Sequence, residues 1–255
     1  MKINRILCFV VGLGLLAVLA HASAADAAEI KVLCSNGLKT VMEELVPQFE
    51  QATKHKVVVK FGLAGALKQQ IEAGEPFDIA VLTPPLVDDL IKQGKIAADT
   101  RTVIARSGLG IMIRAGARKP DISTTEAFKR ALLDAKSLTY AREGASGAYF
   151  AGLLDRLGIA QDVKPKIRPA ATAAQVGEAV THGEAELGVL PVSEILPVRG
   201  AELLAAFPAD VQGYIVMTAG VNAGAAQRGA ARDLIKFLMA PAALPVIKAK
   251  GMERG

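Results

Sequence analysis

One stretch near the start of the chain has residue types suited to holding an anion. An apolar run over residues 30–33 ends at Ser35-Asn36-Gly37, and a helical pattern begins directly after it. We interpret this stretch as a strand, a turn and a helix. Such a junction leaves unpaired N–H groups and the positive end of a helix dipole facing the space above the strand, which favours an anion there. Most strand-to-helix turns bind nothing, so other turns must support the site.

Further turns of small residues follow other predicted strands. Because ligands of open α/β sheets bind at the carboxyl ends of the strands, we expect these turns to meet at one site. They are Ala64-Gly65, Ser146-Gly147-Ala148 and Pro191-Val192-Ser193. Thr83 ends one more strand and either belongs to the same site or is simply a polar residue at a strand end.

Charged residues near these turns offer a second type of contact. Arg106-Ser107 lies where the pattern of the chain changes, and an arginine there can bind a carboxylate through two hydrogen bonds. An exposed or salt-bridged Arg106 is an equally good interpretation. Arg142 and Glu143 precede the Ser146 turn and either face the ligand or pair with each other in solvent.

The elements that must position these residues alternate between strands and helices. Three strand-turn-helix units in succession, followed by a second set of the same kind, predict an α/β fold with parallel strands and right-handed crossovers. The predicted strands are residues 30–33, 56–61, 77–82, 108–114, 136–141, 166–168, 185–190 and 213–219. The predicted helices include residues 67–73, 86–93, 124–133, 148–157, 173–181, 225–239 and 241–250, after a first helix carrying Val41, Leu45 and Phe49 on one stripe.

The N-terminus predicts export. Lys2 and Arg5 precede an apolar run over residues 6–20, and small residues follow, which is the pattern of a secretory signal peptide over residues 1–27. No other stretch approaches the roughly 20 apolar residues that cross a bilayer. We therefore expect a periplasmic protein that is not embedded in the membrane. Its 255 residues, 51% of them hydrophobic, suffice for one large domain or two modest lobes. We also expect a monomer.

Several classes of function have little support. The net charge of +5 is spread along the chain without a concentrated basic face, so we expect no nucleic-acid partner. His55 and His182 stand far apart without the spacing of metal ligands, and we expect neither a metal nor a cofactor. Ser146 lacks the glycine spacing of a nucleophile elbow. Cys34 is more typical of a buried strand residue than of a reactive thiol.

The chain resembles the periplasmic solute-binding proteins of ABC importers, in particular the molybdate-binding group. The resemblance covers nearly the whole chain after the signal peptide. It rests on the first strand with residues 35–40, and on residues 70–79, 145–149, 183–189 and 237–243. It implies a type 2 binding-protein fold, with two lobes that are joined by crossover strands and close on a ligand. By analogy, one lobe comprises residues 29–106 plus 212–255 and the other residues 107–211.

The chain departs from this group at the ligand positions. Molybdate-binding proteins hold their oxyanion with hydroxyls at the first two turns and a tyrosine after a late strand. The corresponding positions here resemble Gly37, Ala64-Gly65 and Pro191-Val192. The resemblance therefore implies an anion site built from backbone N–H groups with Ser35 or Asn36, and its ligand need not be molybdate.

Two functions from different classes remain open. The first is a periplasmic binding protein that delivers a small anion, either an oxyanion or an organic carboxylate, to the membrane permease of an ABC importer. The second is an isomerase, because bacterial aconitate isomerase resembles the same group and moves a proton next to carboxylates. That reaction needs a general base, for which Glu143, Glu194 and His182 are the candidates. His182 alternatively caps a helix or lies in solvent.

Overall fold

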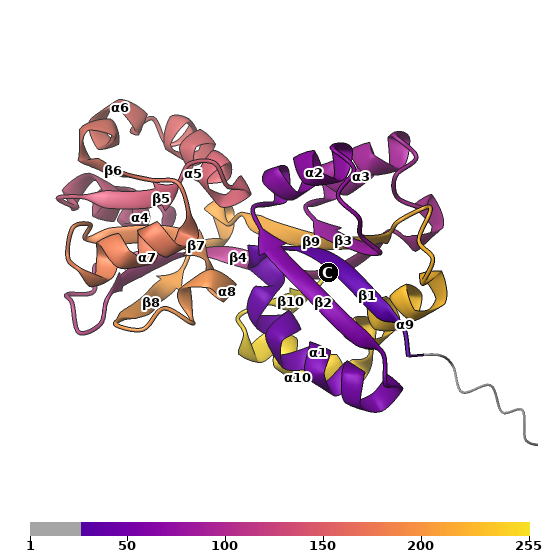
Figure 1. Cartoon of the computed structure of the whole chain (residues 1–255). Coiled ribbons are helices and arrows are strands. Elements are labelled where there is room, and N and C mark those ends of the chain that lie inside the picture. The colour runs from indigo at the N-terminus through magenta and orange to yellow at the C-terminus, as the bar shows by residue number, and fades with distance from the viewer. Residues whose placement is uncertain (1–26) are drawn as a thin grey trace, which may run out of the picture.

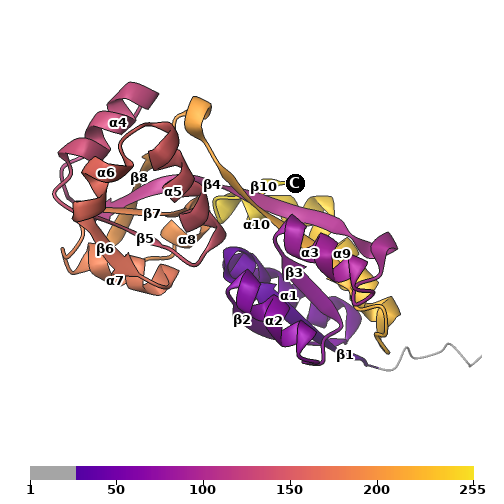
Figure 2. The same cartoon turned by 90° about the horizontal axis from the view of Figure 1, so that it is seen from above.

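One long strand, β4 (Thr102–Arg114), belongs to both halves of the molecule (Figures 1 and 2). It pairs with β9 (Tyr214–Val221) through Gly108, and from Leu109 onward it pairs with β7 (Leu187–Pro191). The computed structural model describes residues 27–255. The predicted signal peptide lies outside the described residues except for Ala27. The two halves are therefore parts of one strand network, joined where β4 passes between them.

The first half contains a mixed sheet. β1 lies between β2 and β3 and runs parallel to both, and β9 pairs antiparallel with β3. Its remaining strands are β1 (Glu29–Ser35), β2 (Lys56–Gly62), β3 (Ile79–Leu82) and β10 (Glu253–Arg254). Its helices are η1 (Asn36–Leu38), α1 (Lys39–Thr53), α2 (Ala64–Glu72), α3 (Pro84–Lys92), η2 (Ala98–Thr100), α9 (Arg228–Met239), η5 (Pro241–Ala243) and α10 (Leu244–Ala249).

The second half repeats the arrangement with different elements. Its strands β5 (Leu138–Ala141) and β6 (Ile167–Ala170) run parallel, β5 also pairs with β7, and β8 (Ala201–Ala206) pairs with β4. Its helices are α4 (Thr125–Asp134), α5 (Ala145–Arg156), α6 (Ala160–Val163), η3 (Lys164–Lys166), α7 (Ala173–Thr181), α8 (Val192–Ile195) and η4 (Ala209–Val211). The mixed α/β class predicted from the sequence is confirmed.

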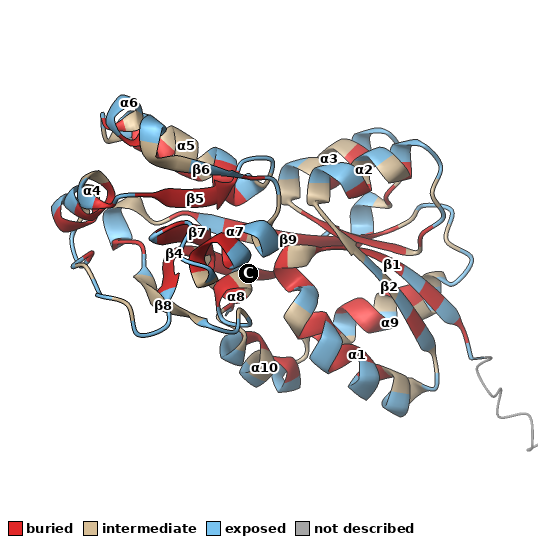
Figure 3. Ribbon diagram, turned by 60° about the vertical axis from the view of Figure 1, so that its left-hand side comes forward, coloured by how far each residue is buried: buried red, intermediate tan, exposed pale blue. Residues whose placement is uncertain are grey.

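Apolar periodicity determines which faces pack inward. In α1, Val41, Leu45 and Phe49 lie at most 1% exposed, because their four-residue spacing places them on one face of the helix. The strands β3, β5 and β7 are buried along their whole length, as Figure 3 shows for the central strands. Continuous apolar runs are typical of strands covered by helices on both faces.

Two parts of the strand prediction were wrong. β4 begins at Thr102 rather than at residue 108, and neither β8 nor the two-residue strand β10 was predicted. The residues of β8 are alanine-rich and mostly half-buried, so they show neither the alternation nor the apolar run that indicates a strand. Two helices also begin earlier in the chain than predicted, α2 at Ala64 and α5 at Ala145. The segment Pro191-Val192-Ser193, predicted as a plain turn, leads into the short helix α8.

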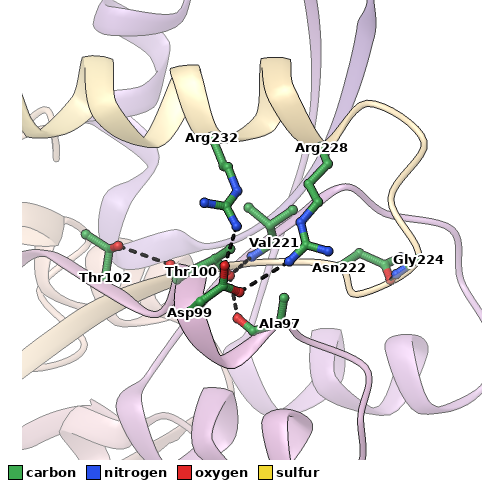
Figure 4. A network of polar contacts seen from close by, with 9 residues as sticks. All are labelled: Ala97, Asp99, Thr100, Thr102, Val221, Asn222, Gly224, Arg228 and Arg232. Carbon is green, nitrogen blue, oxygen red and sulfur yellow. Dashed lines mark hydrogen bonds and ion pairs between the residues drawn. The ribbon is translucent and has the colours of Figure 1, made fainter.

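A network of polar contacts ties η2 to β9 and α9 in the first half (Figure 4). The buried Thr100 hydroxyl donates to Ala97 O at 2.6 Å and accepts from Val221 N at 2.9 Å. Asp99 pairs with Arg228 and Arg232 of α9, and these guanidinium groups hold the pKa of its carboxyl below its usual range. The network fixes the chain just before it enters β4.

Candidate functional site

A cavity of about 220 Å³ lies where the two halves face each other. Residues from both halves line it, which is the position expected for a ligand at the carboxyl ends of the strands. The lining residues are Ser35, Asn36, Leu63, Ala64, Gly65, Thr83, Leu86, Ala141, Glu143, Gly144, Ala145, Ser146, Ala173, Pro191, Glu194, Ile215 and Met217. We call this cavity the cleft.

The first half contributes polar groups at the ends of strands β1, β2 and β3. Ser35 ends β1 and Asn36 begins η1, whereas Ala64 and Gly65 form the first turn of α2. Thr83 precedes Pro84 at the start of α3. The first N–H groups of a helix have no partner inside the helix, so the start of α2 presents donors where Ala64 and Gly65 line the cleft. Helix α3 begins with Pro84 and Pro85, which have no N–H group, so this segment contributes the Thr83 hydroxyl instead.

The second half contributes the start of α5 and the short helix α8. Gly144 is the N-cap of α5 in extended conformation, and Ser146 lies buried in its first turn. Glu143 precedes this turn and is exposed, whereas Glu194 lies on α8. These two glutamates are the ionisable side chains of the cleft lining, and no lysine or arginine belongs to it.

Several residues predicted for the site lie beside the cleft rather than in its lining. Gly37 and Gly147 are buried at positions where a side chain does not fit. A methyl group added to Gly37 would lie 2.4 Å from Met217 Cε, and one added to Gly147 would lie 2.0 Å from the Ala141 carbonyl oxygen. Small residues are required here because neighbouring chain segments approach closely.

The other predicted residues outside the lining include Ala148, Val192 and His182. Ala148 is exposed on α5, and Val192 is half-buried next to Gly251, where an added methyl group would lie 2.6 Å from Val192 Cγ1. His182 is exposed and forms the C-cap of α7. Of the three candidate bases, the structure places Glu143 and Glu194 at the cleft.

Arg106 is engaged elsewhere in this structure. Its guanidinium donates to Glu253 Oε2 at 2.8 Å and lies 4.5 Å from the centre of the Tyr214 ring. Its neighbour Ser107 is 1% exposed and faces the opposite side of β4. The Ser107 hydroxyl donates to Gly251 O at 3.2 Å and accepts from Ser193 N at 3.1 Å. Ser107 thus holds α8 rather than lining the cleft.

A second contact attaches α8 to the first half. The Ser193 hydroxyl donates to the Gly37 carbonyl oxygen at 3.2 Å, and both residues are buried. This bond joins α8 to η1 across the boundary between the halves. As a result Glu194, the next residue, is held against the start of the first helical segment of the chain.

Burial at this position changes the acidity of Glu194. Desolvation penalises the charged carboxylate and raises the pKa of Glu194 to about 7. At neutral pH the protonated and ionised forms are therefore both populated. Such a group can either donate a hydrogen bond to an anion or accept a proton, and perturbed carboxyls of this kind are typical of functional clefts.

Cys34 is not available for chemistry in this structure. It lies fully buried in β1, and burial raises the pKa of its thiol, so the reactive thiolate is suppressed. Among residues 27–255, no group of three or more histidine, cysteine or acidic side chains is arranged to hold a metal ion. No helix in the described part of the chain is long and apolar enough to cross a membrane.

The sequence did not indicate the apolar wall of the cleft. All four of its residues come from the first half. Leu63 precedes α2 and Leu86 lies on α3, whereas Ile215 and Met217 lie on β9, far along the chain. Their side chains look like ordinary core residues in the sequence. Only the pairing of β9 between β3 and β4 brings them to the cleft.

The chain belongs to the family described as bacterial extracellular solute-binding proteins, whose model matches residues 30–253. This match confirms the family resemblance and assigns the chain to a group of proteins that bind small ligands outside the cytoplasm.

Curated relatives extend over most of the chain. An aconitate isomerase of a Pseudomonas species is 29% identical over 230 residues, which cover 88% of this chain and 87% of the relative. The molybdate-binding protein of Azotobacter vinelandii is also 29% identical, over 94% of each chain. The two functions left open by the sequence are thus both represented among similar proteins.

Solved structures confirm the predicted type 2 binding-protein fold. The periplasmic molybdate-binding protein of Azotobacter vinelandii superposes with a TM-score of 0.74 at 22% identity, covering 89% of this chain and 99% of that chain. The sulfate-binding protein of Mycobacterium tuberculosis H37Rv gives a TM-score of 0.73 at 15% identity, covering 89% of this chain and 87% of that chain. At these identities the likeness concerns the fold alone.

Proposed function

We propose that this protein captures a small anion, either an oxyanion or an organic carboxylate, in the cleft and delivers it to the permease of an ABC importer. One observation carries the proposal: helix starts and hydroxyl groups from both halves open onto one small cavity. Hydroxyls of Ser35, Thr83 and Ser146 and the first N–H groups of α2 and α5 can together replace the water around an anion.

The size and composition of the cleft support a small ligand. Its volume of about 220 Å³ lies below the roughly 300–1,000 Å³ typical of pockets for drug-sized molecules. Its lining lacks cationic side chains, so neutral dipoles have to stabilise the charge. The positions where molybdate-binding proteins carry hydroxyls are Gly37 and Ala64-Gly65 here, which favours a ligand other than molybdate.

The proposal includes closure of two lobes over the ligand. Residues 29–106 plus 212–255 would form one lobe and residues 107–211 the other. The pairing of β4 supports this division, because its partner changes from β9 to β7 between Gly108 and Leu109. Rotation about such crossing strands is a usual form of domain closure.

Aconitate isomerisation is the second candidate, and Glu194 favours it. A carboxyl group with a pKa of about 7 inside the cleft can take a proton from a carbon next to a carboxylate and return it to another carbon. The similarity to an aconitate isomerase also supports this second candidate function.

A thermal-shift panel tests the binding proposal. Purified protein is heated with molybdate, tungstate, sulfate, citrate, cis-aconitate or trans-aconitate, because an anion that binds only the folded state raises the melting temperature. We expect one chemical class to stabilise the protein, and Asn36→Ala to reduce that shift. Absence of a shift with every anion would refute capture of these anions.

Interconversion of the two aconitates tests the second candidate. We expect turnover, measured by the change in ultraviolet absorbance or by chromatography, to require Glu194 if the protein is an isomerase. Tight binding of aconitate without turnover would rule out the isomerase.

A further inference from the structure

Glu194 is positioned by two hydrogen bonds of the preceding residue, Ser193. Ser193 N donates to the Ser107 hydroxyl at 3.1 Å, and the Ser193 hydroxyl donates to Gly37 O at 3.2 Å. A methyl group added to Gly37 would lie 3.6 Å from Glu194 Oε1, so this carboxyl lies beside the turn that the sequence identifies as an anion site. The carboxyl therefore faces the cleft at its junction with η1.

No described residue compensates a charge on Glu194. Within residues 27–255 it has neither a hydrogen-bond nor an ion-pair partner among the contacts of the structure. The elements packed against α8 are η1, β4, β7 and β8, and the residues of η1 and β7 carry no ionisable group. The cleft itself adds Glu143, which is also acidic.

The charged groups on the other packed elements do not belong to the cleft lining, and most of them are paired elsewhere. On β4, Arg106 pairs with Glu253 at 2.8 Å, and Arg114 lies at the far end of the strand next to Gly183. On β8, Glu202 pairs with Lys119 at 3.3 Å. Near Gly251, which contacts α8, Lys250 pairs with Glu44 at 2.8 Å. An ionised Glu194 would therefore meet an anionic ligand without a neutralising cation.

We propose that Glu194 is protonated in the anion complex and donates its O–H group to the bound anion, so that capture of an anion by the ionised form of the protein takes up one proton. This inference rests on the proposed function. A neutral carboxyl supplies a donor where the cleft has no cation, and hydrogen bonds from O–H groups to anionic oxygens are among the strong ones.

The acidity of the free protein makes this proton uptake feasible. With a pKa of about 7, Glu194 needs little free energy to take a proton at neutral pH. An anion beside it favours the neutral form and raises this pKa further. Affinity should therefore be full below about pH 7 and fall about tenfold for each pH unit above it, as long as the complex stays protonated.

Isothermal titration calorimetry across about pH 6 to pH 9 tests the proposal. Sulfate, molybdate and trans-aconitate serve as probes, because they remain fully ionised over most of this range. Repeating the titrations in two buffers with different ionisation heats counts the protons taken up. We expect close to one proton per anion at about pH 8, and a dissociation constant that rises about tenfold per unit above pH 7.

Two variants assign the effect to Glu194. Glu194→Gln keeps the size of the side chain and supplies an N–H donor without titrating, so its affinity should not change with pH. Glu143→Gln removes the other cleft carboxyl and should retain the dependence of affinity on pH, whatever its effect on the affinity itself. Thermal melts of both variants check that they are folded.

Three results would overturn the inference. Anion binding by the wild type that is independent of pH would contradict it, as would loss of the pH dependence in Glu143→Gln rather than in Glu194→Gln. Affinity that rises with pH would show Glu194 acting as a proton acceptor, as in the isomerase. Failure of every probe to bind at any pH would instead refute the proposed anion capture itself.

Discussion

Gly37 and Glu194 lie next to each other beside the cleft, although 156 residues separate Gly37 from the Ser193 hydroxyl that binds its carbonyl. The missing side chain of Gly37 leaves room for Met217 and for the Glu194 carboxyl. A hydroxyl cannot be added there without moving Met217, so the chain holds any anion at this turn through main-chain groups or through its neighbours.

We expect Gly37→Ala to weaken anion binding about tenfold and to lower the free energy of unfolding by about 1–2 kcal/mol, because overpacking a tight site costs energy. The new methyl group would lie 2.4 Å from Met217 Cε, the flexible end of a side chain that lines the cleft. Calorimetric titration and urea unfolding measure the two effects.

Gly229→Ala is the matched control, since an added methyl group at Gly229 in α9 meets nothing within 4 Å. It should leave affinity unchanged and stabilise the protein by up to about 1 kcal/mol through the higher helix propensity of alanine. Equal affinities of the two variants would contradict the role given to the space at Gly37.

Two hydrogen bonds of Ser193 fix the position of the short helix α8. It has only four residues, yet Ser193 bonds through its N–H group to Ser107 on β4 and through its hydroxyl to Gly37 on η1. Buried hydrogen bonds of this kind specify position more than they add stability, because leaving one partner unsatisfied is costly.

Ser193→Ala should lower the free energy of unfolding by about 1–3 kcal/mol, because the buried Gly37 carbonyl loses its donor while the N–H bond to Ser107 remains. Urea unfolding measures the change. Ser123→Ala, at an exposed position, should stay within about 0.5 kcal/mol of wild type. Equal stabilities of the two variants would show that the bond across the halves is dispensable.

The arrangement of the two halves determines which charges reach the cleft. The sequence left two interpretations of Arg106 open, a contact with a ligand carboxylate or an exposed or salt-bridged side chain, and the ligand contact stays a prediction. In the structure Arg106 pairs with Glu253 of β10, where exposure limits the strength of an ion pair. The position of β10 beside β4, set by the C-terminal segment of the chain, provides this competing partner.

The variant Arg106→Gln tests whether the guanidinium contacts the ligand or stays paired with Glu253. If the pair with Glu253 persists in the complex, we expect affinity for the anion to change less than about threefold, whereas Asn36→Ala in the cleft should cost about tenfold. Titration calorimetry compares them. A tenfold or larger loss of affinity in Arg106→Gln would indicate that the guanidinium contacts the ligand, which is one of the two interpretations of the sequence.

Local patterns in the sequence were sufficient for the α/β class and for most elements. The stripe of Val41, Leu45 and Phe49 and the apolar runs of β3, β5 and β7 depend only on which faces are buried. The same patterns located the turns at Ser35, Gly65 and Ser146, although not the first residues of the helices, because small residues after a strand show where the chain turns.

Long-range packing decided which of these residues share a cleft and what their environment is. Glu143, Glu194 and His182 were equal candidates in the sequence, since the pattern carries no information on desolvation. The bonds of Ser193 place Glu194 at the cleft, where burial raises its pKa, whereas His182 remains exposed at the end of α7. Burial, ion pairing and cavity shape arise only when distant segments meet, so a single sequence cannot supply them.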